Sequence, residues 1–217
     1  MALFERKVLI VEDEPLIRGL IAVNLTAEGF TVEVASSAAE ARKVAEDFDP
    51  DIAVLDIELG DGPTGIDLAM ILRRQHLEIA LVFLTHIPEP RIVGIENRSI
   101  PKNAAYLVKD RIADPGILRA AIEAALRDRV GKSFRDDKNI EHRFSEVSRN
   151  QLAVLQMVAL GMSNQQIAAD RGTTIRAVEN LVRRAFEAAG IDLESDNNPR
   201  VTAAREYIKL AGLPFGK

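Results

Sequence analysis

The chain has 217 residues, of which 47% are hydrophobic and 28% charged, and this balance excludes wholesale disorder. It holds no cysteine, which excludes disulfides and thiolate metal sites. It also has no apolar run near the ~20 residues of a membrane span and no signal-peptide pattern, so we expect a cytoplasmic protein. The net charge is −5, with the excess of acids in residues 1–126 and almost balanced charges in residues 145–217, so charge alone does not indicate a nucleic-acid binder.

Five short apolar runs recur in the first part of the chain, and helical patterns fill the intervals between them. The runs are residues 8–11, 31–35, 52–55, 79–84 and 104–108. The helical segments carry starting signals: Pro15 in a first turn, Ser37 three residues before Glu40, and Asp114 before a proline. This alternation predicts an α/β domain over residues 1–129, built on a doubly wound, five-stranded parallel sheet.

The rest of the chain changes character. Residues 130–144 are charged and aperiodic, which predicts a linker. Residues 145–217 show only helical patterns, including a short helix after Ser163, a glycine-containing turn, and a longer helix that Thr173 or Thr174 caps and Gly190 ends. The spacing predicts a small all-α domain with a helix-turn-helix.

Polar and charged side chains stand where the predicted strands end. Glu12 and Asp13 follow the first strand, Asp56 the third, Thr85 the fourth and Lys109 the fifth. Because the carboxyl ends of parallel strands share one edge of a sheet, we expect these side chains to meet. Clustered carboxylates repel unless a cation neutralises them, and Mg²⁺ prefers such oxygens. The sequence therefore predicts Mg²⁺ at this edge, with Lys109 as a second compensating charge.

A carboxylate in this setting can attack a phosphoryl group and form an acyl phosphate. Lys109 and Mg²⁺ would neutralise the phosphoryl oxygens, and the hydroxyl of Thr85 could donate a hydrogen bond to one of them. Asp56 is the expected nucleophile.

Residues 5 to about 128 resemble the receiver domain of two-component response regulators. The resemblance is carried by "VLIVEDEP", "AVLDIE", "VFLT" and "AAYLVKD", in this order along the strands. It implies a flavodoxin-like fold and phosphorylation of Asp56 by a sensor histidine kinase. The magnesium site that it implies consists of Asp13, Asp56, the carbonyl of Glu58, and Glu12 through a coordinated water. Its catalytic support and switch residues are Thr85, Tyr106 and Lys109.

Three departures from the receiver pattern bear on switching. Gly60 stands where the family usually has proline, and His86 follows Thr85 where a small residue is usual. Residues 86–103 contain three prolines where a regular helix usually lies, and prolines would shorten such a helix. An atypical receiver that works without phosphate is therefore an alternative.

The longer helix of the tail is amphipathic. Its apolar arc consists of Ile175, Val178, Leu181, Val182, Ala185, Phe186 and Ala189. The opposite side carries Arg176, Asn180, Arg183 and Arg184, and Thr174 stands at the helix start. Because arginine reaches phosphates or guanine and asparagine can bind adenine, we expect these residues to contact DNA. A solvated face, with Glu179 or Glu187 paired to Arg183, is the other interpretation.

Residues 147–211 resemble the output domain of the LuxR/NarL class. The matching stretches are "VSRNQLAVLQMVALGMSNQQIA", "TTIRAVENLV" and "NPRVTAAREY", although Glu179 replaces a frequent basic residue. The resemblance implies a homodimeric transcription regulator whose DNA binding depends on phosphorylation, and not an enzyme. A tail that binds protein or RNA remains an alternative. A receiver-gated enzyme is disfavoured because the tail lacks a nucleophile elbow, a metal-ligand cluster and a phosphate loop.

Overall fold

The computed structural model describes residues 6–60, 62–88, 90, 100–138, 144, 146–194 and 197–211. Among these, residues 6–85 and 100–136 form one compact unit, and residues 86–90 and those from 137 onward form a second. None of the helices in the described part has the length and apolar character that a membrane span requires. Most of the proline-containing segment 86–103 lies outside the described residues.

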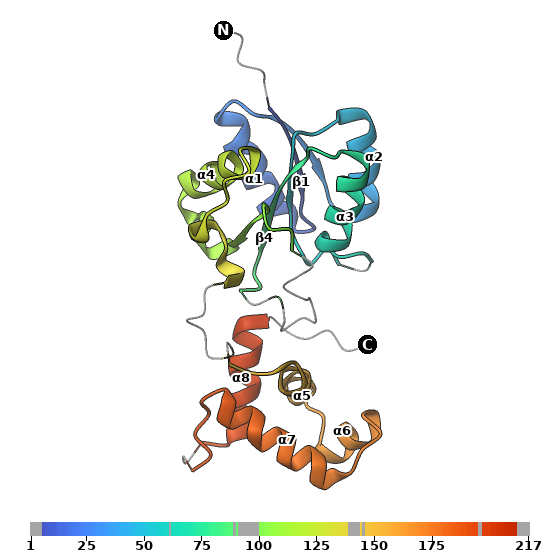
Figure 1. Ribbon diagram of the computed structural model, residues 1–217, viewed down its shortest axis with the longest axis vertical. Helices are drawn as coiled ribbons and strands as arrows, with labels where there is room; N and C mark the ends of the chain where they lie inside the picture. The colour runs from blue at the N-terminus through green and yellow to red at the C-terminus, as the bar shows by residue number, and fades with distance from the viewer. Residues whose placement is uncertain are drawn as a thin grey trace. The chain divides into compact units, whose positions relative to one another are not determined.

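The first unit is a five-stranded parallel sheet with helices on both faces (Figure 1). Its strands, in the spatial order β2-β1-β3-β4-β5, are β1 (Lys7–Val11), β2 (Thr31–Ala35), β3 (Ile52–Leu55), β4 (Ala80–Thr85) and β5 (Ala105–Val108). One face is covered by α1 (Pro15–Ala27) and α4 (Pro115–Leu126), and the other by α2 (Ala38–Phe48) and α3 (Gly65–Gln75). All residues of β3 and β4 are buried, as expected for strands covered on both sides. The predicted α/β fold is confirmed.

Local signals start the helices of this unit. The side chain of Ser37 accepts a hydrogen bond from the backbone N–H of Glu40, and Asp114 accepts one from Gly116, as their sequence positions indicate. Thr64 and Asp67 form a complete capping box at the start of α3. Each such cap contributes about 1 kcal/mol. The helices that frame the sheet edge are therefore specified by residues close in sequence.

The strand register places the ends of neighbouring strands side by side. Val11 pairs with Leu55 and Leu55 with Phe83, while Thr85 pairs with Val108. The residues that follow these positions consequently emerge at one edge of the sheet. A short 3₁₀ turn, η3 (Lys109–Ala113), continues directly from β5 at this edge.

Gly65, the first residue of α3, lies against the backbone of Asp56. A Cβ atom at Gly65 would come within 1.8 Å of the carbonyl oxygen of Asp56 and within 3.2 Å of the Cα of Ile57. We expect Gly65→Ala to lower the free energy of unfolding by about 2 kcal/mol, because backbone must move to make room. Urea unfolding measures this loss.

The matched control for this variant is Gly19→Ala in α1, where no neighbouring atom lies within 4 Å of an added Cβ. Alanine is the better helix former, so this variant should be as stable as the wild type or slightly more stable. Equal unfolding free energies for the two alanine variants would contradict the close approach of Gly65 to Asp56.

The predicted linker begins with residues that belong to the first unit. Residues 132–138 form two 3₁₀ turns, η4 (Lys132–Phe134) and η5 (Asp136–Lys138). Phe134 packs against the core between the sheet and helices α1 and α4, and Arg135 is only 4% exposed and forms a parallel bridge with Tyr106 of β5. The first unit thus extends past the boundary predicted at residue 129 to Asp136, because Phe134 packs against its core and Arg135 bonds to its sheet.

The second unit is helical. Its helices are α5 (Arg149–Ala159), α6 (Asn164–Asp170), α7 (Ile175–Ala188) and α8 (Pro199–Ala211). Ser148 and Ser163 start α5 and α6 with capping boxes, and Thr174 caps α7. A core that includes Phe144 and Tyr207, with ring centroids 6.3 Å apart, joins the helices. The predicted all-α domain with its α6–α7 helix-turn-helix is confirmed.

One residue of the predicted apolar arc of α7 departs from the pattern. Ile175 is 47% exposed, whereas Val178, Val182 and Phe186 are buried. Ile175 is the first residue of the helix, so its side chain lies at the margin of the core that the later turns of the helix cover.

Candidate functional site

Three carboxylates lie together at the carboxyl ends of β1 and β3. Glu12 and Asp13 directly follow β1, Asp56 directly follows β3, and one oxygen from each lies within 4.8 Å of the others. Glu12 and Asp56 are buried, and Asp13 is exposed. The cluster is therefore open to solvent on the side of Asp13.

Lys109 compensates the two buried acids. Its Nζ lies 2.7 Å from Oδ2 of Asp56 and 2.8 Å from Oε2 of Glu12. The carboxylate of Glu14 is more distant, at 3.8 Å, and more than half exposed. Burial strengthens both short ion pairs, because little water remains to screen them. The expected meeting of Glu12, Asp13, Asp56 and Lys109 is present in the structure, while the roles assigned to them stay predictions.

Burial dominates the protonation of this cluster. It raises the pKa of Glu12 to about 7; the hydrogen bond from Lys109 opposes this shift and the charge of Asp56 adds to it. Burial also raises the pKa of Asp56, against the charge of Lys109. For Lys109 burial favours the neutral form, but the charge of Asp56 and the hydrogen bonds to Asp56 and Glu12 prevail and raise its pKa. The lysine is therefore a permanent cation, and Glu12 titrates near neutral pH.

Hydrogen bonds from the backbone N–H of Glu58 and from the side chain of Arg18 hold the acids and their loop in place. The N–H of Glu58 donates to Oδ1 of Asp56 at 3.2 Å, and the half-buried side chain of Glu58 has a pKa raised by burial and by the charge of Asp56. Nη1 of Arg18, from α1, donates to the carbonyl of Glu12 at 2.6 Å and to that of Asp13 at 3.2 Å. Arg18 thereby ties the loop that carries both acids to α1.

The predicted switch residues are buried in β4 and β5, the two strands that follow β3 in the sheet order. Thr85 ends β4, Tyr106 lies in β5, and both are completely inaccessible to solvent. The rings of Tyr106 and Phe83 lie 6.4 Å apart. Since Thr85 pairs with Val108, it stands next to the strand end from which Lys109 emerges. His86, in contrast, is exposed.

Sequence reasoning missed two contributors to this edge of the sheet. Arg18 binds the carbonyls of the acid loop, and Asp136 binds the turn after β5. Arg18 lies on the first helix close to the motif "VEDEP", which could have drawn attention to it. Asp136 lies in the charged segment "RDDK", where nothing in the sequence distinguishes it from a solvated linker residue.

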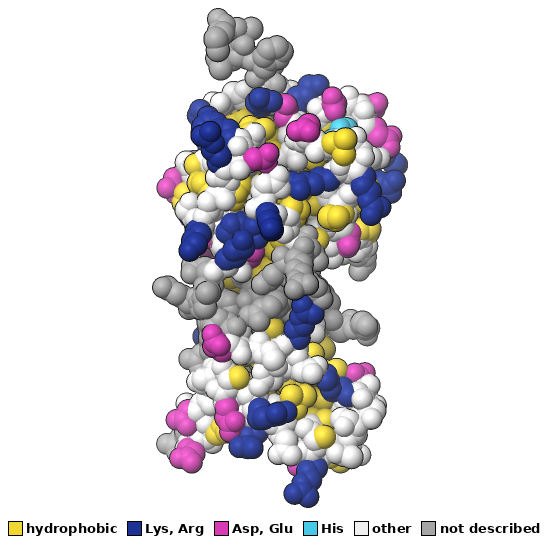
Figure 2. All heavy atoms as spheres, in the orientation of Figure 1, with side chains coloured by type: hydrophobic (Ala, Val, Ile, Leu, Met, Phe, Trp, Pro, Cys, Tyr) yellow, Lys and Arg dark blue, Asp and Glu magenta, His cyan; other side chains and the backbone are white. Residues whose placement is uncertain are grey.

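The residues predicted to bind DNA lie on the accessible side of α7. Arg176, Asn180, Arg183 and Arg184 are exposed. Arg183 forms an ion pair of 2.9 Å with Glu187, one turn further along, as the alternative interpretation allows. On the face shown in Figure 2, basic side chains of the helical unit are scattered among acidic, apolar and uncharged ones. Geometry alone therefore leaves DNA contact by these residues a prediction.

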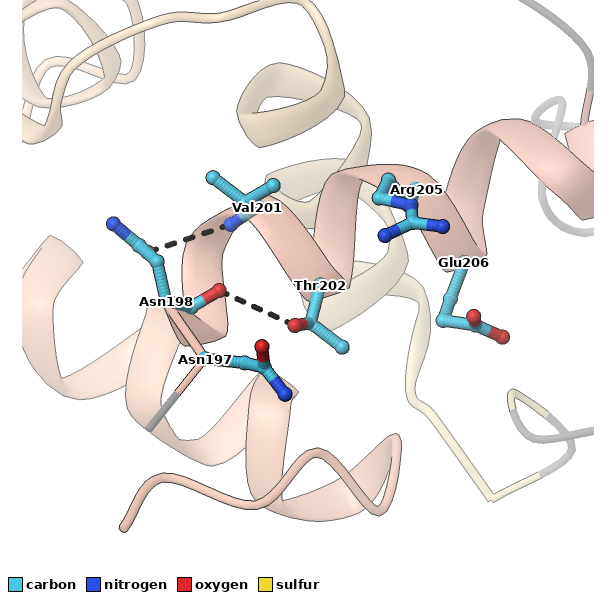
Figure 3. Close-up of a pocket in the computed structure, with 6 residues that line it drawn as sticks. All are labelled: Asn197, Asn198, Val201, Thr202, Arg205 and Glu206. Atoms are coloured by element: carbon cyan, nitrogen blue, oxygen red, sulfur yellow. Dashed lines mark hydrogen bonds between the residues drawn. The ribbon is translucent and has the colours of Figure 1, made fainter. Parts of the chain in front are cut away.

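Two hollows on the described surface lie apart from these predicted residues. One, of about 300 Å³, lies at the start of α8 and is shown in Figure 3; its lining consists of Asn197, Asn198, Val201, Thr202, Arg205 and Glu206. The other, of about 530 Å³, lies by the amino ends of the strands, with Arg6, Asp51 and Ile79 among its lining residues. No predicted site residue lines either hollow.

The acid cluster fits Mg²⁺ by the chemistry of its donors, which are all oxygens and include an exposed carboxylate on Asp13. Mg²⁺ favours deprotonated acids around it, including Glu12, which would reach the ion through a water, so a proton on Glu12, whose pKa is about 7, opposes binding of the ion. We expect the affinity for Mg²⁺ to rise as the pH increases from about 6 to about 8, measured by calorimetric titration with MgCl₂.

Glu12→Gln should flatten this pH dependence, because an amide does not titrate. Glu33→Gln, an exposed acid on β2, should keep the wild-type profile. An affinity that falls with increasing pH, or the same steep profile in Glu12→Gln, would show that Glu12 does not compete with the ion through its proton.

Comparisons with known proteins agree with this architecture. Residues 8–95 match the model of the response regulator receiver domain. The chain is 30% identical over 218 residues to the nitrate/nitrite response regulator protein NarP of Escherichia coli, covering 95% of this chain and 96% of that protein. It is 29% identical over 192 residues to nodulation protein W of Bradyrhizobium diazoefficiens, covering 85% and 81% of the two chains.

A solved structure of the response regulator RcsB in complex with DNA shares the fold, with a TM-score of 0.60 at 19% identity over 95% of this chain and 99% of that chain. The match with NarP extends through the sheet, the acid cluster and the helix-turn-helix alike. The chain therefore belongs to the two-component response regulators, and among them to the NarL/LuxR type of transcription regulator.

Proposed function

We propose that Asp56 accepts a phosphoryl group from the phosphohistidine of a sensor kinase, and that this controls DNA binding by α6 and α7. The observation that supports the proposal best is the ion pair of 2.7 Å between the buried carboxylate of Asp56 and Lys109, beside two further acids. Lys109 favours the charged form of this carboxylate and so opposes the effect of burial, and a charged carboxylate oxygen can attack phosphorus.

The transfer conserves atoms and charge as follows. A carboxylate oxygen of Asp56 forms a bond to phosphorus, and the bond from phosphorus to the imidazole nitrogen of the kinase breaks. The imidazole keeps the electron pair and takes up a proton, and Asp56 becomes an acyl phosphate. Lys109 stabilises the negative charge on the phosphoryl oxygens, and the hydroxyl of Thr85 can donate a hydrogen bond to one of them.

Mg²⁺ would be held by Asp13, Asp56 and the carbonyl of Glu58, with Glu12 ordering one of its waters. When bound, the ion supplies positive charge that offsets the charge of the phosphoryl oxygens. Deprotonated Glu12 and Asp56 would at the same time retain Lys109 between them. The ammonium of Lys109 and the Mg²⁺ ion would then both offset the negative charge of the site.

The output would follow from a change at Thr85 and Tyr106. Both are buried in neighbouring strands, so a hydrogen bond that the hydroxyl of Thr85 donates to the new phosphate would change the packing around Tyr106. Gly60, with a positive φ of 71°, and exposed His86 are the positions where this receiver would differ from its relatives in phosphate access and lifetime.

DNA binding is supported by family membership and by the exposed polar face of α7. Asn180 and Arg176 can reach base edges, Arg183 and Arg184 can reach phosphates, and Thr174 can donate its hydroxyl hydrogen while it caps the helix. A single small recognition helix binds weakly, so a homodimer on two half-sites is part of the proposal. The protein would act in the cytoplasm, where kinase and DNA are available.

Removing both Arg183 and Arg184 should weaken DNA binding and its salt dependence. Each lost phosphate contact lowers the slope of log K against log salt by about 0.9, so Arg183→Ala with Arg184→Ala should lower it by about 2. The measurement is fluorescence anisotropy of a labelled mixed-sequence duplex with the full-length phosphorylated protein over a series of salt concentrations.

Arg119→Ala with Arg127→Ala removes the same charge from exposed positions on α4 and directly after it, and should keep the wild-type slope. If the α7 variant keeps the slope as well, these arginines do not bind phosphates. A helical tail that binds protein or RNA then becomes the better account.

A further inference from the structure

Asp136 lies outside the predicted receiver domain, yet its carboxylate binds the turn that carries Lys109. Oδ2 accepts a hydrogen bond from the N–H of Val108 at 2.9 Å, and Oδ1 lies 2.5 Å from Nη1 of Arg111. Lys109 stands between these two residues, at the start of η3. The side chain of Asp136 is only 12% exposed, whereas that of Arg111 is 35% exposed, so water and salt reach the ion pair from the side of Arg111.

The segment that brings Asp136 to this place is firmly attached. Nη1 of Arg111 also donates to the carbonyl of Ser133 at 2.9 Å. Arg135 is 4% exposed and donates to the carbonyl of Lys102 at 3.1 Å, in addition to its bridge with Tyr106. Asp136 therefore approaches from a segment held by several independent bonds.

The turn after β5 depends on such support because β5 is an edge strand. Among the described strands only β4 pairs with β5, so N–H groups on the other side of β5, where Tyr106 forms its bridge with Arg135, depend on partners outside the sheet. Asp136 satisfies one of them at Val108, immediately before Lys109. The backbone from which the lysine side chain extends is thereby fixed on both sides of the lysine.

Small displacements of Lys109 matter because its ammonium bridges two acids at once. Nζ lies 2.7 Å from Asp56 and 2.8 Å from Glu12. A shift of Nζ by about 1 Å directly away from either acid would lengthen that contact beyond hydrogen-bond distance. Misplacement by about 1 Å can slow a reaction by up to about 100-fold.

We infer that Asp136 is a positioning residue for the phosphorylation of Asp56: it holds the turn that places Lys109 on the acceptor carboxylate. Asp136 touches neither Asp56 nor the other acids of the cluster and acts through Val108 and Arg111. The inference rests on the proposed function, and it extends the receiver site to a residue of the segment that leads toward the output domain.

The first test measures the rate of phosphorylation of the full-length protein with Mg²⁺ and phosphoramidate, followed by intact mass. Asp136→Ala loses both bonds and should react about tenfold more slowly than the wild type. Asp136→Asn keeps an acceptor for Val108 but loses the charge that pairs with Arg111, and should fall between the two. Asp110→Ala removes an exposed acid from the same turn and should react at the wild-type rate.

The second test observes Lys109 directly, by NMR of protein labelled with ¹³C-lysine, with its signal assigned through Lys109→Arg. In Asp136→Ala the ε-methylene signal of Lys109 should move, whereas Asp110→Ala should leave it in place. A purely stabilising role for Asp136 would lower the urea midpoint without moving this signal.

A wild-type rate in Asp136→Ala, or a slow rate with an unmoved Lys109 signal, overturns the inference. If Asp136→Ala does not fold, Asp136→Asn decides by the same two measurements. Failure of the wild type to take up phosphate would instead refute the proposed function, and the Lys109 signal would still report whether Asp136 positions the lysine.

Discussion

Replacing Asp56 by asparagine should abolish phosphate uptake. With Mg²⁺ and a small phosphodonor, the wild type is expected to gain one phosphoryl group by intact mass, and Asp56→Asn none. The amide of asparagine carries no charged oxygen, so it is a poor nucleophile toward phosphorus. It also breaks the charged contact with Lys109, which lies 2.7 Å from the carboxylate in the wild type.

The matched control is Asp47→Asn, which changes an exposed acid on the surface of α2 and should leave the phosphate adduct intact. A phosphate adduct on both the wild type and Asp56→Asn would remove Asp56 from its proposed role. An adduct on neither would favour the predicted alternative of a receiver that works without phosphate.

Loss of the cation between the buried acids should destabilise the first unit severely. Lys109→Met keeps the length of the side chain but leaves Glu12 and Asp56 buried without compensation. Removing one partner of such a buried pair costs about 3 kcal/mol or more, so the urea midpoint should fall markedly in the absence of Mg²⁺. Phosphorylation of Asp56 should slow as well, because Lys109 no longer offsets the charge of the phosphoryl oxygens.

The pH dependence of this loss has a definite sign. In the wild type the pKa of Glu12 is about 7 and that of Asp56 is raised by burial. Without Lys109 the folded-state pKa values of both acids rise above those of the wild type. They then lie still further above the pKa values of the unfolded state. Stability then falls as the pH rises above the unfolded values near 4, so the deficit of Lys109→Met should be smallest near about pH 5 and larger above about pH 7.

Mg²⁺ should restore part of the stability of Lys109→Met, since an ion that binds only the folded state stabilises it by mass action. Lys43→Met, at an exposed position on α2, removes the same charge and should unfold like the wild type. Equal unfolding free energies for the two methionine variants would show that the buried acids do not depend on Lys109.

Much of this architecture could be predicted because its signals are local. Apolar runs, Pro15, Ser37 and Asp114 specify strands and helix starts through neighbours a few residues away, and the structure places these elements close to the expected bounds. The meeting of Asp13, Asp56 and Lys109 also followed, because parallel strands of one sheet must end at one edge.

Contacts between distant segments could not be predicted in the same way. Val108 and Asp136, or Arg135 and Lys102, are joined by single hydrogen bonds that leave no periodic pattern in the chain. The close approach of Gly65 to the backbone of Asp56 is equally invisible before the helix is packed. Such contacts depend on how finished elements fit together.

By itself, then, the amino-acid sequence determined the elements of both domains, the sheet edge at which the acids gather, and the family to which the chain belongs. These follow from hydrophobic periodicity, capping residues and the order of short motifs, which are properties of neighbouring residues. Only the tertiary structure decided that Lys109 bridges Glu12 and Asp56, and that the turn beneath it is held by Asp136 from a segment predicted as linker. The reason is physical: hydrogen bonds and ion pairs form between side chains that packing brings within about 3 Å, whatever their separation along the chain.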